Sequence, residues 1–495
     1  MRLYLEGHAY TYAVEQMLLT LFPEERPQYP EGRPSGDRME IRLSRGARRC
    51  TASCVLVRGG QRWHGRAQAP LDALEDPLER DRRCQRLVKN AMYRAALSSG
   101  REKPVWGALT GVRPGKLLSP LLEQGLPPET AMRRFIREFD VSPQRAQLCL
   151  DASLHTLSAG NALGPRDVCL YVGIPFCPTR CSYCSFVSQS VEKSMALIPP
   201  FLDALEQEIA ASARQLRRLG LRPVSVYMGG GTPTTLSAQQ LDRLCGRLAE
   251  AFDLSALREY TVEAGRPDTI TEEKLEVLRR HGIDRVSVNP QTMSDRVLET
   301  IGRRHTAADI LDALEKVRRV GGFAVNMDLI AGLPGDSPDG FARTLEAVLA
   351  LRPENLTVHT LSLKKGSRIT VEGAALPTAE QVGRMLDTAG ERLRETGYEP
   401  YYLYRQKFMS GGFENVGWTL PGHDNLYNIC IMEELCSIIA MGGGGSTKLI
   451  GPRGGRNIRL MAPKYPQEYI GRIEATCAEK EKIAAFYLQC GGDAP

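Results

Sequence analysis

The sequence lacks the features of a membrane or secreted protein. It contains no run of about 18 apolar residues, which a membrane-spanning helix requires, and its first residues become charged too soon for a signal peptide. An excess of one charge is also missing, because the 495 residues have a formal net charge of only +6. This small value gives no sign of a nucleic-acid partner and is compatible with an acidic ligand. We therefore expect a cytoplasmic protein that binds neither membrane nor nucleic acid.

The chain has thirteen cysteines. Without a secretion signal they belong in a reducing compartment, where thiols serve as ligands or core residues and not as disulfides. Most stand alone in apolar surroundings. Cys245, Cys430 and Cys436, for example, lie in helical patterns, and we expect each to pack in a hydrophobic core.

Length and pattern divide the chain into three predicted domains, since 495 residues are too many for one core. Residues 1–165 mix strands such as Met39–Leu43 with amphipathic helices and form an α+β domain. Residues 166–365 alternate short apolar runs with helical stretches. Residues 366–495 begin with a helix at Thr378–Thr396, and we expect them to form a smaller, mainly helical domain that covers the substrate.

The central alternation predicts an α/β fold. Its apolar runs are continuous, which indicates strands buried on both faces, as in a parallel sheet. An open sheet and a partial barrel both fit, and in either one ligands collect at the carboxyl ends of the strands. The predicted strands are Cys169–Ile174, Val224–Met228, Glu259–Glu263, Asp284–Asn289, Ala324–Ile330 and Leu356–Thr360.

Three cysteines, Cys177, Cys181 and Cys184, follow the first of these strands. The Cys-x3-Cys-x2-Cys spacing lets three thiolates hold three corners of one [4Fe–4S] cluster. It leaves one iron open to the amino and carboxylate groups of a methionine. Zinc is the alternative, but a structural zinc site requires a fourth ligand, and the loop offers no further His or Cys. The spacing therefore predicts an iron–sulfur cluster.

Glycines and polar residues follow the later strands. The run Gly229–Gly231 after the second strand would let the backbone approach a ligand closely. Glu263 ends the third strand, where its carboxylate could accept hydrogen bonds. Arg303 could pair with a carboxylate through its guanidinium group, and Asp328 could accept from an amine or hydroxyl.

These motifs resemble the radical S-adenosylmethionine (SAM) superfamily over at least Val168 to Gly366. The resemblance implies a partial (βα)6 barrel with a [4Fe–4S] cluster and SAM as cofactors. It makes Cys177, Cys181 and Cys184 the catalytic cluster ligands. It also places the glycine run against the methionine end of SAM and Glu263 beside the ribose. The implied SAM-binding residues are Tyr171, Gly230, Gly231, Thr232, Glu263, Gln291, Arg303 and Asp328, although Tyr171 could equally be a core residue.

Within the superfamily, Leu170–Cys177, Tyr227–Thr234 and Asp328–Pro334 are similar to the oxygen-independent coproporphyrinogen III dehydrogenases, and Trp106–Pro114 and Tyr402–Lys407 resemble their HemZ branch. The resemblance implies an oxidoreductase of haem biosynthesis that acts on a tetrapyrrole. An external one-electron donor reduces the cluster, and SAM is cleaved to a radical that takes hydrogen from a propionate side chain. Loss of CO2 and of one electron to an acceptor then leaves a vinyl group. Two rounds would convert coproporphyrinogen III to protoporphyrinogen IX.

Two departures from the family leave the tetrapyrrole reaction open. Phe186 stands where better-studied members carry a fourth cysteine, and Gly173 stands where they carry a histidine. The fourth cysteine is not a cluster ligand, so its absence leaves SAM cleavage intact. The alternative functions are an anaerobic haem-degrading radical SAM methyltransferase and a haem chaperone of the same family.

A substrate with four carboxylates predicts basic residues at the mouth of the barrel. The run Gly442–Gly445 could form an anion-binding concavity there or a flexible turn. The candidate basic residues are Arg113, Lys116, Arg405, Lys407 and Lys448.

Overall fold

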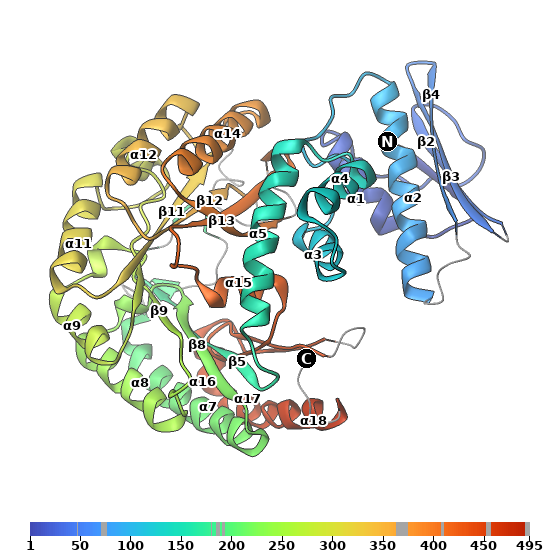
Figure 1. Ribbon diagram of the computed structural model, residues 1–495. Helices are drawn as coiled ribbons and strands as arrows, with labels where there is room; N and C mark the ends of the chain where they lie inside the picture. Colours follow the sequence, from blue (N-terminus) through green and yellow to red (C-terminus); the bar gives the residue numbers. More distant parts are fainter. Residues whose placement is uncertain are drawn as a thin grey trace. The chain divides into compact units, whose positions relative to one another are not determined.

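The chain forms two compact units, Met1–Leu150 and Asp151–Pro495 (Figure 1). No helix in the described part is long and apolar enough to cross a membrane. The predicted domain boundaries at residues 165 and 365 stay a prediction. The computed structural model describes residues 1–46, 48–70, 77–179, 181–184, 189–190, 194–362, 375–406, 410–451 and 457–490.

The first unit packs helices on a four-stranded sheet of order β1-β2-β3-β4. Strand β1 is parallel to β2, and the other pairs are antiparallel. Apolar side chains from β2 and β3 pack against α1 and α2 and form the core of this α+β unit. The elements are β1 (Arg2–Glu6), α1 (Thr11–Leu21), β2 (Arg38–Arg45), β3 (Arg49–Arg58), β4 (Gln61–Pro70), α2 (Pro77–Ser98), α3 (Gly115–Glu123) and α4 (Pro128–Phe139). Helix α5 (Pro143–Asn161) begins in the first unit and ends in the second.

The second unit is built on a sheet with eleven strands among the described residues. Its six central strands are parallel neighbours, and the helices between them lie on the outer side of the sheet (Figure 1). This arrangement confirms the predicted partial (βα)6 barrel. The six strands are β5 (Asp167–Ile174), β8 (Arg222–Gly230), β9 (Glu259–Glu263), β10 (Arg285–Ser287), β11 (Ala324–Ala331) and β12 (Asn355–Thr360).

The outer helices begin where the sequence provides caps. Ser237 and Thr306 each form a capping box with the residue three positions later, which satisfies free N–H groups at the helix start. Thr271 and Ser337 also accept a backbone N–H at the start of their helices. The helices are α7 (Ile198–Leu219), α8 (Ala238–Ala251), α9 (Glu272–Arg280), α10 (Asp295–Thr300), α11 (Ala307–Val320) and α12 (Pro338–Ala350).

The C-terminal segment extends the same sheet at both edges. Strand β14 pairs antiparallel with β12 and carries β13, while β15 pairs parallel with β5 and carries β16 and β17. Helices α16 and α18 pack on α7. The elements are α14 (Ala379–Glu395), β13 (Glu399–Arg405), β14 (Glu414–Thr419), α15 (Leu426–Glu433), β15 (Ser437–Gly442), β16 (Ser446–Leu449), β17 (Ile458–Met461), α16 (Pro466–Gly471), α17 (Ile473–Glu479) and α18 (Glu481–Gln489).

The segment His423–Glu433, which includes α15, covers the amino end of the barrel. The buried carboxylate of Glu259, the first residue of β9, accepts two backbone N–H groups at the start of α15, at 2.7 and 3.2 Å. Arg285 and Asn355, the first residues of β10 and β12, donate to carbonyl groups of the same segment at 3.2 and 2.8 Å. Most of the predicted site residues lie toward the opposite, carboxyl ends of the strands, whereas Tyr171 lies within β5 and stacks on Tyr427 of α15.

Candidate functional site

The loop with the predicted cluster ligands leaves the carboxyl end of β5. Cys177 ends the short strand β6 (Phe176–Cys177), and its sulfur lies 3.5 Å from the Thr232 hydroxyl. Cys181 is buried and Cys184 half-buried, and the Cys184 N–H donates to the Cys181 carbonyl at 3.2 Å. Each ligand of an iron–sulfur cluster holds a different iron, so three thiols of one loop can serve one cluster.

Two buried arginines lie against this loop. An Nη atom of Arg266 lies 3.8 Å from the Cys181 sulfur. Arg303 donates to the carbonyl of Asn289 at 2.6 Å and to the Tyr183 hydroxyl at 3.1 Å. Thiolates that bind iron carry negative charge, which a neighbouring guanidinium group can offset. Two buried arginines are thus in place to offset the negative charge of thiolates in the cysteine loop.

The glycines after β8 approach the loop too closely for a side chain. The Gly231 N–H donates to the Ile174 carbonyl at 2.8 Å, and a Cβ on Gly231 would lie 2.4 Å from the Phe176 carbonyl oxygen. Gly230 has a φ of 108°, a value that favours glycine. The neighbouring Thr232 N–H donates to the Phe176 carbonyl at 2.7 Å. The backbone of this segment is therefore fixed against the strand that carries Cys177.

Two half-buried carboxylates, Glu263 and Asp328, lie in the barrel. Tyr227 donates its hydroxyl to Glu263 at 2.6 Å. Burial and the charge of Asp328 raise the pKa of Glu263 to about 7, although the hydrogen bond from Tyr227 acts to lower it. Asp328 accepts from the Asn326 amide at 2.9 Å and lies 3.7 Å from His359 Nε2. Burial works to raise the pKa of Asp328, but these partners hold it below its ordinary value.

Gln291 follows β10 in a strained conformation. It is buried and has a φ of 67°, the left-handed region that residues other than glycine rarely adopt. Its N–H donates to the Asp328 carbonyl at 2.8 Å, and its own carbonyl accepts from the Ile330 N–H at 3.0 Å. Such strain costs about 1–3 kcal/mol and is found most often at functional sites. The bonds to β11 hold Gln291 in this conformation.

Tyr171 lies in a cluster of tyrosines inside the barrel. Its ring stacks at 6.4 Å on Tyr227 and at 6.1 Å on Tyr427. A Cβ on Gly230 would lie 3.5 Å from the Tyr171 hydroxyl, so the hydroxyl is next to the glycine segment. Tyr171 therefore packs against the core, which was the alternative interpretation of this residue. Its hydroxyl also lies next to the predicted SAM-binding segment.

Several buried polar atoms at this end of the barrel have no hydrogen-bond partner among the described residues. They are Arg303 Nε, Asn289 Oδ1, His305 Nδ1 and Ser182 Oγ. Unsatisfied buried groups cost free energy unless a ligand or water pairs with them. Three thiols, a buried guanidinium donor and buried acceptors are a donor set that fits an iron–sulfur cluster and a ligand with amino, carboxylate and hydroxyl groups.

The structure gives a packing reason for the family departure at Gly173. A Cβ at this position would lie 2.7 Å from the Gly443 carbonyl oxygen, because β15 pairs with β5 there. Gly443 in turn packs on Pro175, with an imagined Cβ only 2.6 Å from the proline ring. The run Gly442–Gly445 is therefore a closely packed turn. The other departure, Phe186, lies outside the described residues.

Two of the basic candidates, Arg405 and Lys448, are buried and do not contribute to an open basic rim. Arg405 is buried and donates to a backbone carbonyl at 2.6 Å, and burial lowers its pKa to about 10. Lys448 is buried in an ion pair of 2.6 Å. Lys407 lies outside the described residues. Arg113 is half-buried and Lys116 is exposed in the first unit.

The sequence analysis missed three residues of this site. Arg266 lies three residues after Glu263, in the segment that follows β9. Its position just beyond the carboxyl end of a barrel strand could have identified it as a candidate. Tyr227 lies inside the largely apolar strand β8, and His359 lies inside β12. Polar side chains in a strand that is buried on both faces indicate a ligand-facing position or an internal network.

Comparison with known proteins agrees with this geometry. The model of the radical SAM superfamily matches residues 171–348. The oxygen-independent coproporphyrinogen-III oxidase-like protein HemZ of Bacillus subtilis (strain 168) is 40% identical over 382 residues, which cover 76% of each chain. The chain belongs to the radical SAM superfamily, in the HemZ family. This confirms the resemblance that the motifs indicated.

The chain is also similar to proteins whose names give different functions. The heme chaperone HemW of Bacillus subtilis (strain 168) is 31% identical over 250 residues, 50% of this chain and 64% of HemW. The structure of coproporphyrinogen III oxidase (HemN) from Escherichia coli covers 68% of this chain and 78% of HemN, with a TM-score of 0.51 and 23% identity, which shows a shared fold. The cofactors of the radical SAM superfamily, a [4Fe–4S] cluster and SAM, are those of this chain.

Proposed function

We propose that the chain is an oxygen-independent coproporphyrinogen III dehydrogenase, which converts two propionate side chains to the vinyl groups of protoporphyrinogen IX. The similarity to HemZ carries this proposal. It extends over 382 residues, well beyond the radical SAM match at 171–348, and so includes regions outside the cofactor-binding strands. Substrate choice depends on such regions, since the superfamily shares the cofactors but not the substrates.

Cys177, Cys181 and Cys184 would hold the cluster, which when bound and reduced supplies the electron that cleaves SAM. The chain's own residues set its position and charge. The bonds of Gly231 to β5 fix one side of the loop, and Arg266 beside Cys181 offsets thiolate charge. Reductive chemistry in a protein depends on this kind of positioning and electrostatic support.

Glu263 and Arg303 would bind the two polar ends of SAM. Tyr227 orients the Glu263 carboxylate, which would accept hydrogen bonds from the ribose. The fork of Arg303 is already fixed by two hydrogen bonds, and its unpaired Nε would be left for the methionyl carboxylate. The further proposed contacts are Tyr171, Gly230, Gly231, Thr232, Gln291 and Asp328.

The segment His423–Glu433 covers the amino end of the barrel, so the tetrapyrrole would enter at the carboxyl end. There the reacting propionate would lie near SAM, away from bulk water. Exclusion of water protects a reactive radical from side reactions. An external one-electron donor and an electron acceptor would complete the reaction.

Anaerobic turnover tests the proposal. The reduced, cluster-loaded protein is incubated with SAM and coproporphyrinogen III, and 5′-deoxyadenosine, CO2 and vinyl products are measured. We expect one 5′-deoxyadenosine for each vinyl group, and none from Cys181→Ala. Cys245→Ala, which removes a buried thiol from α8, should retain the activity. A linear tetrapyrrole from haem would instead identify a haem-degrading enzyme.

A haem chaperone is the second candidate, favoured by the similarity to HemW over 250 residues. The two functions differ in whether the protein binds haem as a cargo or turns over a porphyrinogen substrate. A chaperone binds haem in a stoichiometric complex and releases it to an acceptor protein without forming 5′-deoxyadenosine. Stoichiometric haem binding together with no turnover of coproporphyrinogen III would replace the proposed activity with this one.

A further inference from the structure

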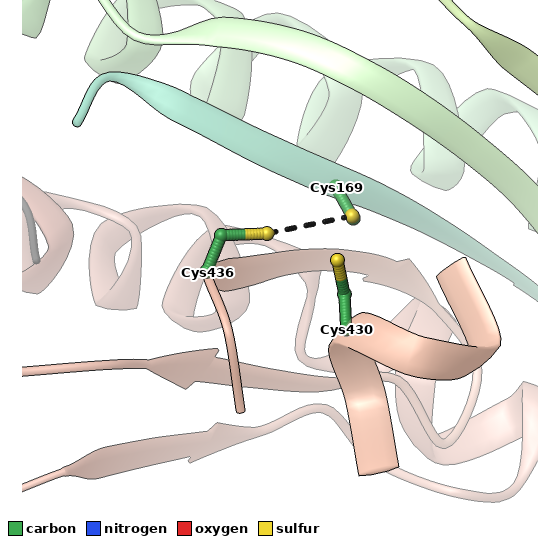
Figure 2. A group of neighbouring side chains, drawn as sticks. All are labelled: Cys169, Cys430 and Cys436. Carbon is green, nitrogen blue, oxygen red and sulfur yellow. Dashed lines mark hydrogen bonds between the residues drawn. The ribbon is translucent and has the colours of Figure 1, made fainter. Parts of the chain in front are cut away.

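A second group of three cysteines lies at a different place in the barrel. Cys169 comes from β5, Cys430 from α15 and Cys436 from the residue before β15, and the three side chains point toward one another (Figure 2). All three sulfurs lie within 4.8 Å of one another, and those of Cys169 and Cys436 are 3.6 Å apart. Cys430 and Cys436 are buried in a hydrophobic core, as expected, but they do not stand alone there.

The sulfur spacing is that of ligands around one metal ion. Thiolates bind a metal such as zinc at about 2.3 Å, which places the sulfurs of a three-coordinate ion about 4 Å apart. The observed spacing, 3.6 Å for one pair and within 4.8 Å for all, brackets this value. A small inward movement would close the group on an ion. A disulfide needs a much shorter distance and would leave the third thiol over.

The surroundings favour a soft ion with three ligands. Around the thiols lie apolar and aromatic side chains, among them Val224, Tyr427 and Ile438. Among the described residues, no His, Asp or Glu joins the group. A structural zinc ion would therefore lack a fourth ligand. Thiolates select soft ions such as Cu(I).

We propose that Cys169, Cys430 and Cys436 form a binding site for a soft, thiophilic metal ion of the Cu(I) class, separate from the predicted cluster loop. The site joins the first barrel strand, the helix that covers the amino end of the barrel and the strand that pairs beside β5. A bound ion would cross-link these three segments, so its role would be structural. This proposal does not depend on the reaction that the enzyme catalyses.

The test uses the full-length, cluster-loaded protein under anaerobic conditions. Cu(I) is supplied as a complex with a chromophoric chelator, and the protein's uptake is followed by loss of that colour. We expect one tightly bound equivalent, three sulfur scatterers without nitrogen or oxygen in copper X-ray absorption, and a rise of several degrees in Tm. Iron content measured before and after shows that the cluster survives.

Matched serine variants assign the binding to this group. Cys436→Ser and Cys169→Ser should weaken Cu(I) uptake at least tenfold and abolish the Tm rise. Cys245→Ser, in α8, and Cys50→Ser, which breaks a buried thiol pair in the first unit, should retain both effects. If the wild-type protein takes up no Cu(I), or if its copper has fewer than three sulfur ligands, the proposal fails. Uptake unchanged in Cys436→Ser would overturn it equally, and this measurement needs no catalytic activity.

Discussion

Glu263 combines burial with a proposed role that requires its charge. Its carboxylate lies in the barrel under the hydroxyl of Tyr227, and its pKa is raised to about 7, chiefly by burial. A carboxyl with a raised folded-state pKa stabilises the fold below its unfolded pKa and loses that contribution as the pH rises through the folded pKa. Near and above pH 7 the charged Glu263 carboxylate would therefore favour SAM binding while lowering the free energy of unfolding.

Glu263→Gln should separate these two effects. Gln cannot ionise, so we expect the variant to gain up to about 3 kcal/mol in free energy of unfolding over wild type at pH 8, and little at pH 5. Its affinity for SAM should fall about tenfold because a charged acceptor is lost. Urea denaturation at both pH values and equilibrium binding measure this. Glu276→Gln, on the exposed side of α9, is the control, and equal stability changes in both variants would contradict the argument.

Arg303 tests whether fork geometry, and not charge alone, matters at the site. Its two Nη atoms already bond to Asn289 and Tyr183, which leaves Nε unpaired. A lysine keeps the charge, but its ammonium group cannot reproduce the planar fork of N–H donors on three nitrogens. We expect Arg303→Lys to weaken SAM binding about tenfold, roughly 1.4 kcal/mol, with iron content unchanged. Arg304→Lys, at the exposed neighbouring residue, should bind SAM normally; a loss of the cluster in Arg303→Lys would point to folding instead.

Two side chains satisfy N–H groups at the start of helix α15: the buried carboxylate of Glu259, and Asn425, which accepts from the Asn428 N–H at 2.8 Å. Glu259 accepts the N–H groups of Leu426 and Tyr427 and also the hydroxyl of Ser225 at 3.1 Å. Free N–H groups at a helix start carry partial positive charge, so a carboxylate satisfies them well. The same helix carries Cys430 of the proposed metal site. Its position therefore affects the amino end of the barrel and the thiol group together.

Glu259→Gln should loosen α15 from the barrel. The amide keeps the size of the side chain but turns one acceptor into a donor that faces N–H groups. We expect a loss of about 1–3 kcal/mol in unfolding free energy, with faster amide hydrogen exchange at residues 425–430. Glu299→Gln, at an exposed position of α10, should change neither. Unchanged exchange in α15 would show that Glu259 does not hold the helix.

The division of the molecule into two units predicts which part suffices for SAM cleavage. Every proposed cluster and SAM contact, from Tyr171 to Asp328, lies in the second unit. A chain of residues 143–495 keeps α5 whole and contains that unit. We expect it to bind the cluster and to form 5′-deoxyadenosine at a rate within a few fold of the full chain. Failure to bind iron would show that residues 1–142 are needed to form the site, and full-length protein prepared in parallel is the reference.

Local patterns in the sequence were enough to predict the barrel. The barrel strands contain apolar runs such as that of β5, and four of the outer helices, α8, α9, α11 and α12, begin at a side-chain cap. Such features depend on residues a few positions apart, so they can be read without a structure. The C-terminal strands escaped prediction because strand pairing is decided by distant partners. The aromatic run at Tyr398–Tyr404, for example, became β13 by pairing with β14.

The sequence by itself determined the cysteine loop, the order of the strands along the chain and the family. Only the tertiary structure decided that Arg266 lies beside Cys181 and that Gly443 leaves no room for a side chain at Gly173. It also brought Cys169 and Cys436 together across 267 positions of the chain. Backbone pairing between β5 and β15 sets that contact. No spacing within either segment records it, because the register of two distant strands is fixed by the packing of the whole sheet.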